Sequence, residues 1–351
     1  MRVCLDSIIF GLQRVGGIST YWVELCRYLA RDPEIELHLR MPRNIIGIAA
    51  AGTTALTRYV TTDCLPTKIG RYFPLPTHRG AIHHSSYYRR PLSALGISVV
   101  TVYDFVYERV RTGFARSVHS WQKSSAIRRA HGVFCISENT RRDLLERYPD
   151  IDPARVIVTA LGVASDRFFP VLSNEIDRTL SDAVVFVGTR GRYKCFELAI
   201  EGVSRVSGLR LAIVGGDLTT EERASLERHL SRRWLMLGSI SDEALRRTYG
   251  SCFAFIFPSS YEGFGLPILE AMACGCPVVT NRLSSFPEVG GDAALYSNSQ
   301  TADAYAEQLV RLTDSSVRAF FVNAGLSRSR LFPWSRTFFQ TVEFYRKLVA
   351  S

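Results

Sequence analysis

The chain has 351 residues, of which 46% are hydrophobic and 22% charged, a balance that excludes a disordered protein and predicts two domains. Its formal net charge is +10, and no apolar run approaches the ~20 residues of a membrane-spanning helix. The eight cysteines lie mostly inside apolar runs and show no zinc spacing, which favours reduced thiols of an intracellular protein over a disulfide framework.

Short apolar runs alternate with amphipathic stretches along the whole chain, a pattern typical of parallel α/β layers. Gly16 and Gly17 follow the first run and precede a helical pattern, where a backbone can approach a phosphate or a sugar. A glycine pair at such a turn is more often plain turn chemistry. Ser137 is expected to cap a helix that begins at Glu138. The strands expected in this half are VCLDSI, EIELHL, AIHHSS, ISVVTVY, GVFCIS and RVIVTA.

The second half shows the same alternation of apolar and amphipathic runs. A polar segment without periodicity, about residues 164 to 182, separates the halves and is the expected linker. We therefore predict two Rossmann-like domains, the first over residues 1–170 and the second over residues 171–332. An apolar-faced helix is expected in FPWSRTFFQTVEFYRKL, after Leu331. The strands expected here are AVVFVG, LRLAIVGG, RWLMLG, FAFIFP, PVVT and AALYS.

Polar residues stand at the ends of two strands of the first half. Tyr103 and Asp104 end the run VVTVYD, and ligands of α/β sheets bind at the carboxyl ends of the strands. His83 and His84 end another strand, and a structural pair is as good a reading of them as a functional one.

Basic residues are concentrated between Pro66 and His131, where eleven Lys or Arg accompany only two acids, Asp104 and Glu108. With the aromatic residues between them, they suit an anionic membrane surface, a pyrophosphate-bearing acceptor or nucleic acid, and a solvated basic face is the alternative. Nucleic acid is not expected, because no helix-turn-helix, RNP or zinc signature is present. The basic residues are Lys68, Arg71, Arg79, Arg89, Arg90, Arg109, Arg111, Arg116, Lys123, Arg128 and Arg129.

The run FVGTRGRYK places Gly188, Arg190, Arg192 and Lys194 directly after a buried strand. An Arg with a Lys can stabilise the charge of a departing diphosphate without a metal. Only four lysines occur among the 43 basic residues, so a lysine here is not casual surface charge.

A second glycine turn follows the run RWLML at another predicted strand end. Gly238, Ser239 and Ile240 can hold a nucleobase there by backbone hydrogen bonds and apolar contact. The alternative is that Ser241 merely caps the next helix, and both interpretations are compatible.

The most informative segment is PSSYEGFGLPILEAMACGCPVV, which begins at Pro258 and sets Glu262 and Glu270 around a glycine-rich turn. Gly263, Phe264, Gly265 and Leu266 can present backbone N–H groups at the start of a helix, where an anion binds readily. Glu270 lies about one turn into that helix, where a carboxylate accepts hydrogen bonds from ribose hydroxyls. The segment predicts a sugar-nucleotide site.

This segment resembles the E-x7-E signature of the retaining GT-B glycosyltransferases of glycosyltransferase family 4. The resemblance covers nearly the whole chain, since VGGIST, HSSYYRRP, VVTVYD, CISENTRRDLL, FVGTRGRYK and LGSISDEAL occur in that family's order and rough spacing. It implies two doubly wound domains facing a cleft, the first for the acceptor and the second for the nucleotide-sugar donor. It also implies that the C-terminal helix, residues 333–351, crosses back to the first domain.

The resemblance assigns roles to the residues that match the motifs. Arg190 and Lys194 take the diphosphate-binding places, Glu262 contacts sugar hydroxyls, and Glu270 holds ribose. The amides of Phe264 to Leu266 hold phosphate and sugar, and the loop with Gly16 and Gly17 faces the cleft. Family members commonly carry His-Asp where this chain has Tyr103 and Asp104, so an aromatic ring and a hydroxyl remain but a titrating imidazole does not.

The resemblance further implies a hexosyl transfer with retention, in cell-surface polysaccharide biosynthesis. GDP-mannose is the first choice of donor, because the likeness is to bacterial O-antigen and mannan transferases. The implied partners are this donor and a glycan or polyprenyl-pyrophosphate-linked acceptor, and the implied location is the cytoplasm, peripheral at the inner membrane face. A sugar-nucleotide epimerase of the same fold, or a non-catalytic nucleotide-sugar or glycan-binding protein, remains an alternative.

No metal or other cofactor is expected. Asp150 and Asp152 match the DxD pattern of metal-dependent glycosyltransferases, but Pro153 and a strand-like run follow them. This context is a loop, and the basic diphosphate site makes a metal unnecessary.

Overall fold

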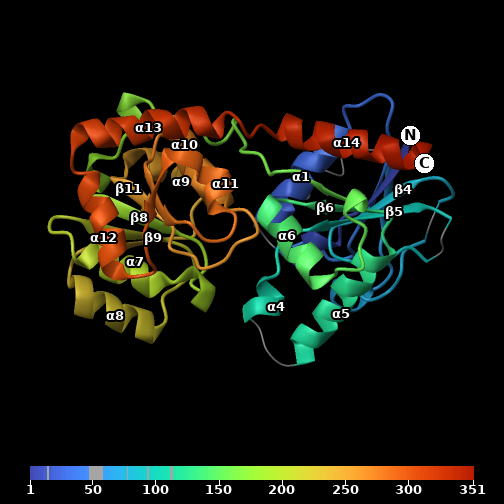
Figure 1. Ribbon diagram of the computed structural model, residues 1–351, viewed down its shortest axis with the longest axis horizontal. Helices are drawn as coiled ribbons and strands as arrows, with labels where there is room; N and C mark the ends of the chain where they lie inside the picture. The colour runs from blue at the N-terminus through green and yellow to red at the C-terminus, as the bar shows by residue number, and fades with distance from the viewer. Residues whose placement is uncertain (14–15, 47–57, 77, 93–94, 111–113) are drawn as a thin grey trace. The chain divides into compact units, whose positions relative to one another are not determined.

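The computed structural model of the protein describes residues 1–351 except 14–15, 47–57, 77, 93–94 and 111–113 (Figure 1). Val15 and Arg111 of the segments discussed above lie outside the described residues, as does the side chain of Arg116. The chain divides into two compact units. Unit 1 consists of Met1–Leu161 and Trp334–Ser351, and unit 2 of Gly162–Pro333.

Unit 1 contains a sheet of seven parallel strands in the order β3-β2-β1-β4-β5-β6-β7. All strands expected in this half are present, and β3 is an addition. Its four residues are exposed, because it is a short edge strand, and for that reason it lacks an apolar pattern. The strands are β1 (Arg2–Asp6), β2 (Glu36–Met41), β3 (Tyr59–Thr62), β4 (Ile82–Ser85), β5 (Ile97–Val102), β6 (Gly132–Cys135) and β7 (Val156–Val158).

The helices of unit 1 include the C-terminal helix α14, which packs beside α1, as Figure 1 shows. The hydroxyl of Ser137 accepts a hydrogen bond from the Thr140 N–H and caps α6, as expected. The helices are α1 (Gly17–Leu29), α3 (Thr67–Gly70), α4 (Val106–Val110), α5 (Phe114–Arg129), α6 (Glu138–Arg147) and α14 (Trp334–Ala350).

His84 explains why α14 belongs to unit 1. Its Nδ1 is hydrogen-bonded to the Tyr345 hydroxyl of α14 at 2.5 Å, and its Nε2 to the Thr101 hydroxyl at 2.7 Å. Burial lowers the pKa of His84 to about 3, so the imidazole is neutral at physiological pH. His84 is therefore a structural residue that fastens a helix distant in sequence to the central sheet.

Unit 2 contains six parallel strands in the order β10-β9-β8-β11-β12-β13, all of them expected from the sequence. The strands are β8 (Ala183–Val187), β9 (Arg210–Val214), β10 (Trp234–Gly238), β11 (Ala254–Ile256), β12 (Val278–Asn281) and β13 (Ala294–Ser297). The fold class is therefore confirmed, with two doubly wound parallel sheets.

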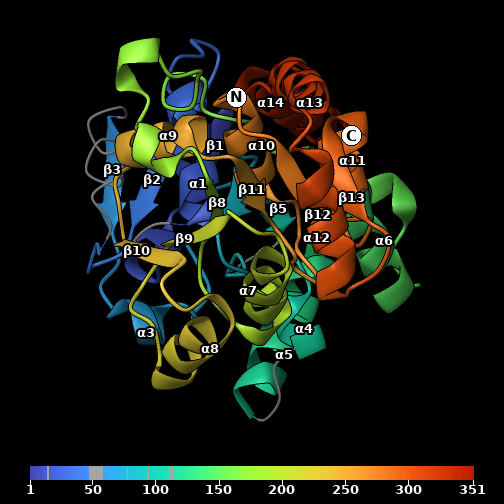
Figure 2. The same cartoon turned by 90° about the vertical axis from the view of Figure 1, so that its left-hand side faces the viewer.

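Helices cover both faces of the unit 2 sheet. Figures 1 and 2 show α7, α8 and α12 on one face, and α9, α10, α11 and α13 on the other. The core side chains of the first face come from β8, β9 and α7, among them Val184, Leu211 and Ile200. The helices are α7 (Phe196–Ser204), α8 (Thr220–Leu230), α9 (Asp242–Ser251), α10 (Leu266–Ala273), α11 (Phe286–Gly290), α12 (Ala302–Arg311) and α13 (Ser315–Ser329).

The first stretch of unit 1 ends at Leu161, and unit 2 begins at Gly162. The polar composition instead predicted a domain boundary between residues 170 and 171 and a linker over about residues 164 to 182. That segment is part of unit 2. Glu175 pairs with Arg246 of α9 at 2.6 Å, and the Asp177 N–H donates to the Ser251 hydroxyl. A polar composition is typical of a linker that faces solvent. Here polar side chains of the segment pair with α9 instead, and composition alone does not distinguish the two cases.

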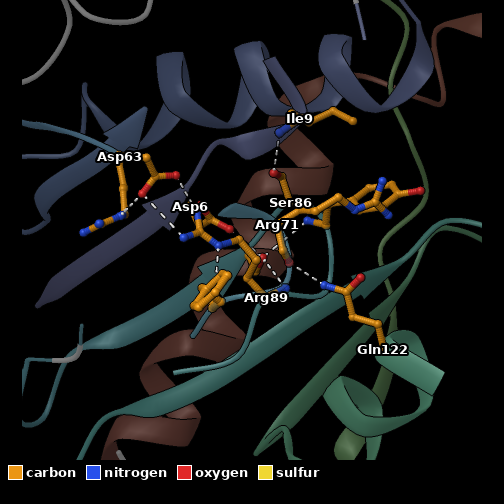
Figure 3. Close-up of polar contacts among 11 residues, drawn as sticks. Asp6, Ile9, Asp63, Arg71, Ser86, Arg89 and Gln122 are labelled. Carbon is orange, nitrogen blue, oxygen red and sulfur yellow. Dashed lines mark hydrogen bonds and ion pairs between the residues drawn. The ribbon is translucent and has the colours of Figure 1, made fainter. Parts of the chain in front are cut away.

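A buried cluster of charges lies at the carboxyl end of β1 (Figure 3). Arg89 Nη1 is 3.0 Å from Asp6 Oδ1 and 2.7 Å from Asp63 Oδ2, and its side chain is 3% exposed. The Ser85 hydroxyl donates to the second oxygen of Asp6, and Arg40 pairs with Asp63. The cluster thus joins the ends of β1 and β4 to the residue that follows β3.

The structure shows that some cations of the region between Pro66 and His131 are not on the expected basic surface. Arg89 is neutralised inside unit 1, and Lys123 is buried 3.3 Å from Glu108. Arg109 and Arg128 pair with Asp143 and Asp150. Arg89 and Lys123 therefore add no charge to the surface, whereas Arg109 and Arg128, 48% and 45% exposed, reach solvent as members of ion pairs.

We predict that Arg89→Met destabilises the protein by about 3–5 kcal/mol, because Asp6 and Asp63 are left as buried charges without a partner. Arg31→Met, at an exposed position, is the control and should change stability by less than about 0.5 kcal/mol. Urea unfolding measures both. Burial raises the pKa of Asp6, so its protonation favours the folded state, and the defect of Arg89→Met should shrink as the pH falls. Equal unfolding midpoints for the two variants would contradict a stabilising cluster.

Candidate active site

The strand order of unit 2 reverses between β8 and β11. The chain runs outward from β8 to β9 and β10 on one side, and from β11 to β12 and β13 on the other. The loops after β8 and β11 therefore separate at this point, and ligands of open α/β sheets bind in the crevice that results. The two loops carry the predicted diphosphate residues and the Glu262 turn.

An ion pair joins the two loops. Lys194 Nζ lies 2.5 Å from Glu262 Oε1, and the two side chains are 12% and 16% exposed. The N–H and the hydroxyl of Ser260 both donate to the carbonyl of Tyr193, at 2.7 and 3.1 Å. The structure thus brings together two residues that the sequence places 68 positions apart (262 − 194), at the point where a ligand is expected.

Serine side chains after β12 hold the Glu262 turn. The Ser284 hydroxyl donates to the Glu262 carbonyl at 2.5 Å, and the Ser285 hydroxyl donates to the Phe264 carbonyl at 2.7 Å. Gly265 then adopts φ 104°, a left-handed conformation that favours glycine, and α10 begins at Leu266 without a side-chain cap. The turn that includes Gly263 is therefore fixed from outside, as a preorganised binding loop requires.

Arg190 has a partner that the sequence did not predict. Its Nε lies 2.9 Å from Glu222 Oε2, and its Nη2 donates to the carbonyls of Gly216 and Asp217 at 2.8 and 2.5 Å. Glu222 also accepts a hydrogen bond from the Thr219 N–H in the capping box of α8. The T-x-x-E spacing was visible in the sequence, but its connection with Arg190 was not.

The glycines beside Arg190 allow two loops to approach closely. Gly188 has φ 121° directly after β8, and a Cβ on Gly215 would lie 2.5 Å from the Gly188 carbonyl oxygen. Arg192 is exposed, unlike Arg190 and Lys194, whose side chains are largely buried. The three cations predicted from one run therefore have different environments.

Glu270 is a half-buried carboxyl group on α10. Burial, and to a smaller extent the charge of Asp242, raise its pKa to about 7 against the opposing charge of Arg167. Arg167 and Asp242 form an ion pair of 2.7 Å. Glu270 therefore changes its charge near neutral pH, and a ligand that donates hydrogen bonds favours the ionised form.

Gly238 ends β10 with φ 72°, and its carbonyl accepts a hydrogen bond from the Gly215 N–H. Ser239 is exposed and Ile240 is half-buried after it. The Ser241 hydroxyl accepts from the Ala244 N–H and caps α9, which confirms the capping interpretation. The nucleobase contact expected of this turn stays a prediction.

The remaining predicted site residues belong to unit 1. Gly16 is the N-cap of α1 and Gly17 its first residue. Asp104 accepts a hydrogen bond from the Val106 N–H at the start of α4. Tyr103 is buried, and its hydroxyl accepts from the Trp22 indole N–H at 2.5 Å. Tyr103 does follow β5 as expected, its hydroxyl is held inside unit 1, and its contact with the donor sugar stays a prediction.

The two aspartates of the DxD match have structural roles. Asp150 pairs with Arg128, and Asp152 caps a 3-10 helix through the Ala154 N–H. Within the part of the chain that the structure describes, no group of three or more His, Cys, Asp or Glu is arranged to hold a metal ion.

Comparisons with known proteins show what the chain is similar to. Residues 177–324 match the family model of glycosyl transferases group 1. A stretch of 125 residues is 41% identical to O-antigen chain mannosyltransferase B of Escherichia coli and spans 35% of this chain and 33% of that protein. Over their whole lengths, this chain and alpha-maltose-1-phosphate synthase of Mycobacterium tuberculosis strain CDC 1551 are 27% identical.

Solved structures show the same fold at low sequence identity. Sucrose-phosphate synthase of Thermosynechococcus elongatus superposes with a TM-score of 0.74 at 18% identity, over 100% of this chain and 99% of that one. Anabaena HepE, in complex with UDP and glucose, gives 0.74 at 15% identity, over 98% and 99% of the chains. The chain therefore carries a glycosyl transferases group 1 domain and is a glycosyltransferase of the GT-B fold.

Proposed function

We propose that the protein is a retaining hexosyltransferase of glycosyltransferase family 4 that transfers mannose from GDP-mannose in cell-surface polysaccharide biosynthesis. The proposed acceptor is a glycan or a polyprenyl-pyrophosphate-linked glycan. The observation that carries the proposal is the Lys194–Glu262 ion pair at the strand reversal of unit 2. The choice of mannose is supported by the 41% identical stretch of an O-antigen mannosyltransferase.

The ion pair suggests how donor binding begins. A diphosphate is a stronger partner for Lys194 than one carboxylate, so the arriving donor exchanges places with Glu262. Glu262 then accepts hydrogen bonds from hydroxyls of the sugar, on a turn that Ser284 and Ser285 hold in place. Arg190, held by Glu222, adds positive charge near the same loop.

During the reaction, the bond between the anomeric carbon and the diphosphate oxygen breaks, and negative charge develops on the leaving group. Lys194, Arg190 and the amides of Phe264 to Leu266 stabilise that charge without a metal. The acceptor hydroxyl attacks on the face that the diphosphate leaves, and its proton passes to the departing diphosphate. This route retains the configuration and needs no second carboxylate as a nucleophile.

GDP-mannose should raise the melting temperature of the protein more than UDP-glucose does, since a ligand that binds only the folded state stabilises it. Mannose transfer should continue undiminished in EDTA, and the Arg190→Ala, Lys194→Ala double variant should stay folded but lose nearly all activity. A matched control is Arg192→Ala, at an exposed position of the same loop. An absolute requirement for manganese or magnesium would contradict the metal-free mechanism.

The two carboxylates should differ in their kinetic effects. Glu262→Ala should lower turnover roughly 100-fold, because its contacts strengthen in the transition state, whereas Glu270→Ala should weaken donor binding. Because the pKa of Glu270 is about 7 and only the carboxylate accepts two ribose hydroxyls, affinity for GDP-mannose should be about tenfold higher at pH 8 than at pH 6. Calorimetric titrations of Glu270→Gln should show no such pH dependence. Unchanged kinetics for both Ala variants would refute these assignments.

We also propose that unit 1 binds an anionic membrane surface. The described part of the chain contains no helix long and apolar enough to cross a bilayer. Exposed aromatic and aliphatic side chains gather on α3 and directly after it, at Ile69, Tyr72 and Phe73, next to Lys68 and Arg71. In interfacial binding, apolar side chains typically insert into the membrane surface, and neighbouring cations face the lipid phosphates.

The membrane proposal is tested by sedimentation with vesicles. Binding should appear with anionic vesicles and fall steeply with salt, because each basic residue contributes ~1 kcal/mol at the surface. Replacement of Ile69, Tyr72 and Phe73 by Ser should abolish it, whereas the same change at the exposed Phe320 of unit 2 should not. Equal binding to neutral and anionic vesicles, or none to either, would leave the basic region a solvated face.

A further inference from the structure

Unit 1 contains a pocket of about 320 Å³ whose described lining shares no residue with the candidate active site. It lies over one face of β4 and β5, below the segment that joins these strands and beside the last turns of α5. Side chains alternate along a strand, so His83 and Ser98 face this pocket while His84 and Thr101 point to the side of α14. The volume falls within the range of small-molecule sites.

The charge of the pocket is positive. Arg90 and Arg129 line it, and none of its described lining residues is acidic. Arg90 Nη1 donates to the Ser125 hydroxyl, and Arg129 is exposed. Among the residues that the structure describes, no carboxylate lies within ion-pair distance of either guanidinium. Arg89 also lines the pocket, but Asp6 and Asp63 balance its charge.

Two imidazoles add hydrogen-bond donors to the same wall. His131 Nδ1 accepts from the Ser98 N–H at 3.1 Å, and His83 Nε2 accepts from the His78 N–H at 3.1 Å. A backbone N–H can only donate, so these two nitrogens carry no proton and the neutral rings carry theirs on the other nitrogen. Each ring therefore keeps one N–H donor in a fixed tautomer, which suits an anion better than a cation.

The rest of the lining is apolar. Apart from Ser85 and Ser98, it consists of Gly96 and apolar side chains, among them Pro74, Leu75, Pro91 and Leu92, of which Leu92 is 67% exposed. Trp121, 64% exposed, lies beside Arg90, whose guanidinium is 5.9 Å from the centre of the indole ring. Apolar side chains left in water beside a cationic pocket fit a ligand that is itself part apolar and part anionic.

We propose that this pocket binds the phosphate end of an amphiphile, a phosphate or diphosphate ester of a long apolar chain. Arg90 and Arg129 pair with the phosphate oxygens, the His83 and His131 N–H groups donate to them, and the first carbons of the chain lie against Leu75 and Leu92. The inference rests on the proposed function, since it gives the lipid-linked acceptor a binding place in unit 1.

The test is calorimetric titration of the full chain with farnesyl diphosphate, inorganic pyrophosphate and farnesol, below the micelle threshold. An Arg190→Ala, Lys194→Ala background prevents the diphosphates from binding to unit 2. Farnesyl diphosphate should bind at least tenfold more tightly than pyrophosphate or farnesol, and Arg90→Gln and Arg129→Gln should each weaken it at least tenfold. Arg31→Gln, exposed and outside the pocket lining, is the matched control.

Three outcomes of these titrations would overturn the inference. Equal affinity for pyrophosphate and farnesyl diphosphate would mean a site for soluble anions, and equal losses in Arg31→Gln would mean unspecific charge attraction. An absence of binding in protein with a wild-type unfolding curve would remove the pocket as a site. Binding of farnesyl diphosphate to the double variant, together with no mannose transfer by the unmodified protein, would refute the proposed function and leave the pocket in place.

Discussion

The candidate active site depends on one ion pair, between Lys194 and Glu262, that forms only because the strand order reverses between β8 and β11. Parallel strands end at the same edge of a sheet, so the loops after β8 and β11 meet there and then diverge. Removal of either partner leaves a largely buried charge without compensation, which costs far more than a surface pair contributes. Because an unpaired charge at this place is unfavourable, Lys194 and Glu262 stay paired until, in the proposed function, the donor diphosphate replaces the carboxylate. In the proposed function, stability and donor binding therefore use the same charges.

Unit 1 has an equivalent reversal between β1 and β4, yet it uses that place differently. There Arg89 is paired with Asp6 and Asp63, and the Ser85 hydroxyl completes the shell of Asp6. These side chains are almost completely buried, whereas Lys194 and Glu262 keep some contact with solvent. One architecture therefore yields a closed structural cluster in the first unit and a partly exposed ion pair in the second. Both reversals carry charged side chains. The two sites differ in how deeply these side chains are buried and in how many partners each cation has.

Tertiary structure also separates cations of the basic region between Pro66 and His131 by their environments. Arg89 and Lys123 are buried and compensated, Arg90 and Arg129 line a pocket, and Lys68 and Arg71 flank an exposed apolar surface. Net charge in the sequence counts all of them alike. Only burial and the distance to a carboxylate separate the cations that stabilise the fold from those that attract a ligand.

The sequence by itself determined the fold class, the twelve apolar strands, the cap at Ser137 and the likeness to glycosyltransferases, because these depend on local patterns of apolar residues, glycines and caps. It also indicated the glutamate turn and the basic loop, whose chemistry is confined to short segments. Only the tertiary structure decided that Glu222 holds Arg190, that Tyr103 is a core residue and that the polar segment after Leu161 packs on α9. Each of these rests on partners tens of residues away, and spacing along a chain carries no record of such contacts. The edge strand β3 escaped prediction for the opposite reason, since an exposed strand has no buried face to leave a pattern.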